Sequence, residues 1–171
     1  MSYTEMVGFN KDGSAYSQAD IHNAFLGAME VWRRMEEKYL PMGQFSRCVM
    51  GSEKDMREIW DLVGNDKVSE NDQICLATTF DNCVVKKEDF HKVITAFREF
   101  DGETSLSEQA DVIEEMLADE DCIAVAWNQT SVNCNQWLSD SFNEEKEEYI
   151  PYNLFSGEKH FYLFKESEDN Q

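Results

Sequence analysis

The longest amphipathic pattern in the chain, at residues 17–40, places the tightest constraint on its fold. Its apolar residues recur with the spacing of one helical face. These residues are Ile21, Phe25, Ala28, Met29, Trp32, Met35 and Tyr39. Ser17 or Asp20 can cap the start of the helix, and Pro41 marks its end. We therefore predict a long N-terminal helix whose apolar face packs on a core.

Two further segments carry the same period. Residues 52–63 begin at Ser52, with Asp55 three positions later, which is the pattern of a helix N-cap. Residues 86–100 gather their apolar side chains on one face. Those side chains are Phe90, Val93, Ile94, Phe97 and Phe100. Both segments are predicted to be helices.

A fourth helix is predicted at residues 105–121, where Ser105 and Glu108 match the S-x-x-E capping box. Its expected buried stripe consists of Leu106, Ala110, Ile113 and Leu117. A separate face carries a row of carboxylates at helical spacing. This acidic row consists of Glu108, Asp111, Glu115 and Asp119.

Short alternating or apolar runs predict the strands. The strand segments are 1–10, 14–16, 73–86 as a hairpin, 122–132, 148–153 and 159–165. Residues 70–80 could instead form a helix. The fold class expected is α+β, with N-terminal and central helices packed on an antiparallel sheet. Residues 1–165 are expected to form a single domain, followed by a flexible acidic tail at 166–171.

The net charge of −20 is unevenly distributed along the chain. Residues 1–98 carry a net charge of −4, whereas residues 99–171 carry −16. Such a field repels nucleic acids and membrane surfaces and attracts basic partners. We therefore expect neither direct nucleic-acid binding nor membrane binding.

The sequence shows neither a secretory signal nor an apolar run near the roughly 20 residues that span a bilayer. The five cysteines are odd in number and form no C-x-x-C pair. Reduced thiols and a cytoplasmic location are therefore expected.

Enzymatic chemistry has one candidate constellation, in which Ser131 or Cys134 acts with His160 and an amide from Asn128 or Gln129. No nucleophile elbow accompanies it, so a small hydrolase is kept only as an alternative. Metal-ligand spacing and phosphate-binding loops are absent from the sequence, and we expect no metal or cofactor.

The remaining candidates form a binding surface made of acidic side chains and one aromatic residue. Besides the acidic row, they are Glu144, Glu145, Glu147, Glu148 and Trp137. Acidic faces commonly serve solubility alone. The alternative is that these carboxylates mimic nucleic-acid phosphates in a basic groove, with Trp137 as a surface anchor.

Five segments carry a resemblance to known proteins. They are residues 23–41, 77–97, 105–113, 127–132 and 152–164. These resemble a family of small acidic proteins from phages, plasmids and integrative elements of Firmicutes. Small acidic proteins of such elements include type II-A anti-CRISPR proteins, which block Cas9. The resemblance implies partner binding rather than catalysis.

We therefore expect a non-enzymatic inhibitor that binds a basic groove of a host defence nuclease. Cas9, or its complex with guide RNA, is the first candidate partner. A phage or mobile-element accessory protein that binds another host protein is the alternative within the same class.

Overall fold

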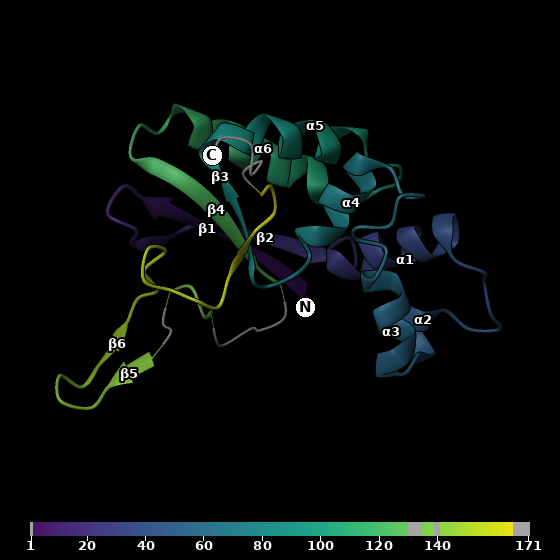
Figure 1. The fold of residues 1–171 in the computed structure, drawn as a ribbon, viewed down its shortest axis with the longest axis horizontal. Coiled ribbons are helices and arrows are strands. Elements are labelled where there is room, and N and C mark those ends of the chain that lie inside the picture. Colours follow the sequence, from purple (N-terminus) through teal and green to yellow (C-terminus); the bar gives the residue numbers. More distant parts are fainter. Residues whose placement is uncertain (1, 130–134, 139–140, 166–171) are drawn as a thin grey trace, which may run out of the picture.

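The structure is a computed structural model that describes residues 2–129, 135–138 and 141–165 (Figure 1). Its strands are β1 (Ser2–Asn10), β2 (Ala15–Ala24), β3 (Cys83–Lys86), β4 (Cys122–Asn128), β5 (Ser141–Asn143), β6 (Glu148–Ile150) and β7 (Phe161–Tyr162). Its helices are α1 (Ala28–Tyr39), α2 (Arg47–Met50), α3 (Glu53–Trp60), α4 (Glu70–Ala77), the 3-10 turn η1 (Lys87–Asp89), α5 (Phe90–Glu99) and α6 (Leu106–Ala118). The expected α+β class is confirmed. The expected tail at 166–171 lies outside the described residues.

Five strands form the main sheet in the order β2-β1-β4-β3-β7. Neighbouring strands are antiparallel except at one edge, where β7 runs parallel to β3 and pairs Cys83 with Phe161. The sheet is therefore mixed rather than purely antiparallel. Strands β5 and β6 form a separate two-stranded sheet.

Side chains point alternately to the two faces of the sheet along the central strands, and both faces are buried. Met6 of β1 and Trp127 of β4 pack in the core formed with the helices. Their neighbours Val7 and Ala126 pack on the opposite face, against the segment around Trp137 and Tyr152. Figure 1 shows α5 and α6 along one side of the sheet and the β5–β6 hairpin projecting from the other. The sheet thus separates the helices from the residues around Trp137, Tyr152 and Leu154, whereas Phe161, Leu163 and Phe164 pack on the helix side.

A turn at residues 10–13 connects β1 to β2. The Gly13 amide donates to the Asn10 carbonyl at 2.8 Å, and Gly13 has a φ of +83°, which favours glycine. The C-terminal segment docks on this turn, because the Leu154 amide donates to the Gly13 carbonyl at 2.8 Å. The turn therefore joins the β1–β2 hairpin to the second core, by which we mean the buried cluster around Trp137 and Tyr152.

The long helix expected at residues 17–40 is wrong in its first third. Residues 17–24 continue β2, in which Ile21 and Asn23 are buried while their neighbours are exposed. The helix begins only after Gly27, and Phe25 is 87% exposed. Pairing with β1 decides this outcome, because the strand register turns Ile21 and Asn23 to the buried side while their neighbours face water.

The hairpin expected at residues 73–86 is half correct. β3 forms as predicted, but residues 70–77 are α4, the helical alternative. The Ser69 hydroxyl caps this helix by accepting from the Asp72 amide at 3.3 Å. Ile74, Cys75, Leu76 and Ala77 are all buried. Because α4 is enclosed on several sides, its sequence shows no clear helical period.

Two expected helix caps have different outcomes. The Ser52–Asp55 box is confirmed, since the Ser52 amide donates to Asp55 Oδ2 at 2.7 Å and its hydroxyl accepts from the Asp55 amide. The Ser105–Glu108 box is wrong. The Ser105 hydroxyl instead accepts from Gln109 Nε2 at 3.1 Å within the core.

The buried stripe of α6 differs from prediction at its end. Leu117 is 41% exposed, and Met116 is buried in its place. Gln109 is also buried, and its Oε1 accepts from Trp127 Nε1 at 3.0 Å. This bond joins α6 directly to β4.

The three expected C-terminal strands form in shortened versions. The predicted strand 122–132 ends at Asn128 as β4, and residues 130–132 lie outside the described residues. β6 and β7 occupy parts of the segments 148–153 and 159–165. Within the described part of the chain, no helix is long and apolar enough to cross a membrane.

Candidate partner-binding surface

The β5–β6 hairpin projects from the sheet and carries one of the two acidic clusters predicted from the sequence (Figure 1). Phe142 pairs with Tyr149 across the two strands. At the turn, Asn143 Oδ1 accepts from the amides of Glu145 and Lys146 at 3.0 and 3.1 Å. This Asx-type arrangement shapes the turn through hydrogen bonds within the hairpin itself.

Acidic and aromatic side chains share the surface of this hairpin. The predicted contact residues Glu144, Glu145, Glu147 and Glu148 are all exposed. The rings of Phe142 and Tyr149 meet edge to face at 5.0 Å, and the two residues are 50% and 64% exposed. Aromatic residues are enriched at protein–protein interfaces relative to the rest of the surface. We call residues 142–150 the acidic hairpin.

One cation lies within the acidic hairpin. Lys146 Nζ stands 3.9 Å from Glu148 Oε1, and both side chains are more than 60% exposed. An ion pair so open to water contributes little. The acidic hairpin therefore presents a net negative surface to a partner.

The acidic row on α6 also lies on the surface, with Glu108, Asp111, Glu115 and Asp119 all exposed. Arg98 of α5 partly neutralises it. Its Nη2 lies 2.5 Å from Asp111 Oδ1 and 3.4 Å from Glu114 Oε2. The hydrogen bond to Asp111 raises the pKa of Arg98. The row is therefore a weaker mimic of a phosphate backbone than its spacing indicates.

The structure does not bring the two acidic clusters together. α6 packs in the helix-side core, whereas the acidic hairpin extends from the segment that covers the opposite face (Figure 1). Exposed aromatic side chains accompany the hairpin. The expectation of aromatics beside an acidic face thus applies to the acidic hairpin, and we treat α6 as a second, separate acidic surface.

The expectation that Trp137 is a surface anchor is wrong. Trp137 is 0% exposed, and its Nε1 donates to the Trp127 carbonyl at 2.9 Å. Its ring meets those of Phe9 and Tyr152 edge to face, at 5.8 and 4.9 Å. The polar residues that precede Trp137 suggested a surface position, but the packing makes it the centre of the second core.

The alternative of a small hydrolase depends on Ser131 or Cys134, which lie outside the described residues. Its proposed base, His160, is half-buried. His160 Nδ1 lies 2.5 Å from the Tyr152 hydroxyl, and its ring meets Tyr162 edge to face at 5.1 Å. Burial lowers the pKa of His160. The contacts of the imidazole join two parts of the C-terminal segment, which is a structural role.

Gln129, the amide proposed as orienting group, is fully engaged in hydrogen bonds. Its Oε1 accepts from Thr4 Oγ1 at 2.6 Å, and its Nε2 donates to the Thr78 carbonyl at 3.2 Å. Its backbone amide donates to Asp81 Oδ1 at 2.7 Å. Gln129 therefore links β1, β4 and the turn before β3.

Replacing Gln129 with alanine is expected to lower the free energy of unfolding by about 1–3 kcal/mol, because the buried Thr4 hydroxyl loses its acceptor and the buried Thr78 carbonyl loses this donor. Urea denaturation measures the loss. The exposed Gln44→Ala is the control, and it should change stability by less than about 0.5 kcal/mol. Equal effects of the two variants would contradict the structural role of Gln129.

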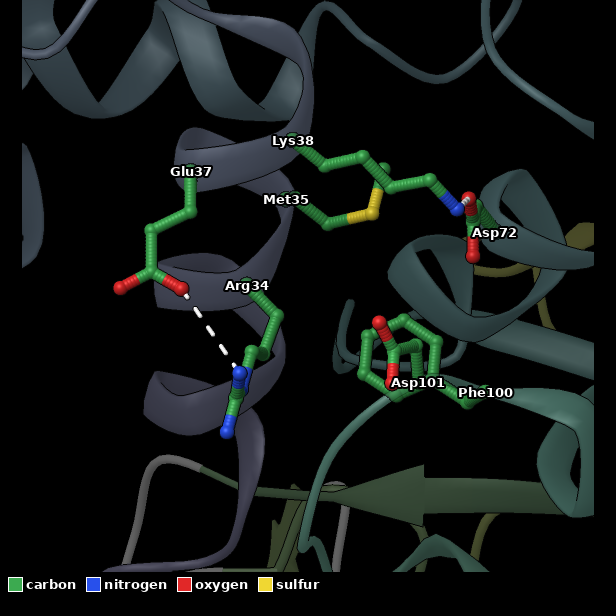
Figure 2. Close-up of a pocket in the computed structure, with 7 residues that line it drawn as sticks. All are labelled: Arg34, Met35, Glu37, Lys38, Asp72, Phe100 and Asp101. Atoms are coloured by element: carbon green, nitrogen blue, oxygen red, sulfur yellow. Dashed lines mark hydrogen bonds and ion pairs between the residues drawn. The ribbon is translucent and has the colours of Figure 1, made fainter.

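A cavity of about 290 Å³ opens beside α1 (Figure 2). Figure 2 shows Lys38 reaching across it to Asp72, with Nζ 2.6 Å from Oδ2, while Arg34 pairs with Glu37 at 3.8 Å. Burial acts to raise the pKa of Asp72, but hydrogen bonds from Lys38 and Tyr39 outweigh it and hold that pKa below its usual range. Both cations are therefore already paired with carboxylates, and the pair of Lys38 with Asp72 joins α1 to α4 across the cavity.

No group of three or more His, Cys, Asp or Glu side chains among the described residues is arranged to hold a metal ion. Cys122 lies buried at the start of β4, where its thiol donates to the Ala124 carbonyl at 3.6 Å. Burial raises the pKa of the Cys75 and Cys83 thiols, so both stay protonated and unreactive. These cysteines act as core residues.

The acidic hairpin is thus the predicted feature that best fits a binding role. The sequence signal was its run of glutamates, whereas the exposed aromatic pair becomes evident only in the folded hairpin. Comparisons of the chain with protein-family models, curated proteins and solved structures found no significant match.

Proposed function

We propose that this protein is a non-enzymatic inhibitor encoded by a phage or mobile element. It binds a basic nucleic-acid-binding surface of a host defence nuclease, and Cas9 with its guide RNA is the first partner to test. One observation carries the proposal: an exposed acidic hairpin that combines four carboxylates with an aromatic pair. Carboxylates steer a basic partner, and aromatic side chains supply the buried contact that holds it.

The charge distribution supports the same proposal. Residues 99–171 carry a net charge of −16, and they include both the acidic hairpin and the row on α6. Long-range attraction from such a region accelerates association with a basic groove and weakens as salt screens it. The acidic hairpin forms the contact in this proposal, while α6 adds to the field.

Changing Glu144, Glu145, Glu147 and Glu148 together to glutamine is expected to weaken binding to a reconstituted Cas9–guide RNA complex. The expected loss is about tenfold at low salt, or roughly 1.4 kcal/mol, and it should shrink as salt is raised. Surface-immobilised binding at two salt concentrations measures both effects.

The matched control removes the same number of charges elsewhere, by changing four exposed acids to their amides. These acids are Asp66, Glu70, Glu88 and Glu103. It should weaken binding less than the hairpin variant, because it alters the field but not the contact. Equal losses in both variants would reject the hairpin as the interface. Absence of binding by the natural chain at every salt concentration would reject Cas9 as the partner.

A further inference from the structure

A second cavity, of about 430 Å³, lies between α1, α3 and the turn after α4, and its lining is aromatic and acidic. The aromatic lining residues are Trp32, Trp60 and Phe80. Asp61 and Asp81 supply carboxylates, and Thr79 completes the lining. No lysine or arginine lines it among the residues that the structure describes.

The aromatic lining is held by contacts from several elements. The Trp32 and Trp60 rings meet at 6.1 Å with an interplanar angle of 71°. Trp32 Nε1 donates to Thr79 Oγ1 at 2.8 Å, which fixes its ring against the turn after α4. The Phe80 ring packs against Phe161 at 6.5 Å. These three aromatic residues remain partly exposed, so they are open to a ligand.

The two carboxylates differ in how they are held. Asp61 is exposed at the C-cap of α3, and Asp81 is half-buried and accepts from the Gln129 amide at 2.7 Å. Aromatic faces attract cations through their quadrupole, and carboxylates add charge-assisted hydrogen bonds. A pocket of this lining therefore favours a ligand that is at once cationic, flat and rich in N–H donors.

We propose that this pocket binds the guanidinium group of an arginine side chain presented by a protein partner. Guanidinium combines a planar surface for stacking on indole with N–H donors for two carboxylates, whereas an ammonium group is compact and more strongly hydrated. The charge of the whole chain favours the same occupant. The inference rests on the proposed function only in assigning that arginine to a basic partner.

The test uses the intact protein and N-acetyl-arginine methylamide, which carries the side chain without charged termini. Titration followed by the indole N–H signals in NMR should give saturable shifts for Trp32 and Trp60, with a dissociation constant on the order of 1 mM. Trp127 and Trp137 are 0% exposed and serve as internal controls that should not shift. The result does not depend on which partner the acidic hairpin binds.

Two related ligands test whether the pocket requires the charge and the planar shape of guanidinium. The matching citrulline derivative keeps the shape but lacks the charge, and it should bind at least tenfold more weakly. The lysine derivative should also bind more weakly than arginine. Equal binding of citrulline, or tighter binding of lysine, would overturn the guanidinium assignment.

A substitution checks the location. Asp61→Asn should weaken arginine binding about five- to tenfold, because it removes one charged acceptor. Asp66→Asn, an exposed acid that does not line the pocket, should change it less than twofold. Equal effects of the two variants would reject the site. So would unchanged indole N–H signals of Trp32 and Trp60 at a ligand concentration about 50 times the expected dissociation constant.

Discussion

Replacing Trp137 with alanine is expected to lower the free energy of unfolding by about 3–5 kcal/mol. Its indole is fully buried between Phe9 and Tyr152, and it donates to the Trp127 carbonyl at 2.9 Å. Truncation removes this apolar contact, leaves a cavity and deprives the carbonyl of its donor. Chemical denaturation of the natural chain and the variant measures the difference.

Trp137→Phe separates the two contributions. It keeps a ring in the core but removes the N–H group, so the expected cost is smaller, about 1–3 kcal/mol. Tyr149→Ala is the matched control on the acidic hairpin, where the aromatic side chain is 64% exposed. It should leave stability within about 0.5 kcal/mol and weaken partner binding. A Trp137→Ala protein of unchanged stability would show that this indole is not a core residue.

Replacing Glu36 with alanine is expected to have a comparable effect, about 3–5 kcal/mol, because it breaks a buried ion pair. Glu36 lies on α1 with 0% exposure. Its carboxylate accepts from Arg47 Nη1 at 2.9 Å, from the Arg47 amide at 3.1 Å and from Ser46 Oγ at 2.8 Å. Arg47 Nε also binds Glu58 Oε2 at 2.8 Å, so this cluster joins α1, α2 and α3.

The same cluster predicts a dependence of stability on pH. Burial acts to raise the pKa of Glu36, but the hydrogen bonds from Arg47 and Ser46 outweigh it and hold the pKa below its ordinary value of 4.5. A carboxyl group with a depressed pKa stabilises the fold fully above its unfolded pKa, and this contribution disappears as pH falls through the folded pKa. The natural chain should therefore lose stability below pH 4.5 more steeply than Glu36→Ala.

Two variants define the controls for Glu36. Glu37→Ala removes the neighbouring exposed carboxylate, which pairs with Arg33, and should cost less than about 1 kcal/mol. The double variant Glu36→Leu with Arg47→Met replaces the ion pair by apolar side chains and should recover most of the stability lost in Glu36→Ala. Identical pH profiles for the natural chain and Glu36→Ala would contradict the role of this carboxylate.

The helices that cover one side of the sheet were predictable from sequence, because each has one buried face and one solvent-exposed face. α5 and α6 follow the apolar period of residues 86–100 and 105–121, and the Ser52–Asp55 cap fixed the start of α3. The run of glutamates at 144–148 was likewise visible, although the hairpin that carries it was not predicted, because only a strand at 148–153 was expected. In each case the signal is local, since neighbouring residues alone decide which side of the element meets water.

Elements whose partners are distant in sequence were not predictable in this way. Residues 17–24 fit a helical period, but pairing with β1 makes them a strand. α4 is buried on several sides and so loses its period. Trp137 follows polar residues, yet it lies against Phe9 from the opposite end of the chain. Such contacts depend on which surfaces meet, and local sequence does not encode that.

The sequence by itself determined the α+β class, the sign of the surface charge and the position of the glutamate run at 144–148, because composition and short periods fix these properties. Only the tertiary structure decided that the two acidic clusters stand on opposite sides of the sheet (Figure 1). It also decided that Trp32, Trp60 and Phe80 converge with two carboxylates around one cavity. Both depend on chain packing, which brings together residues that local patterns treat separately.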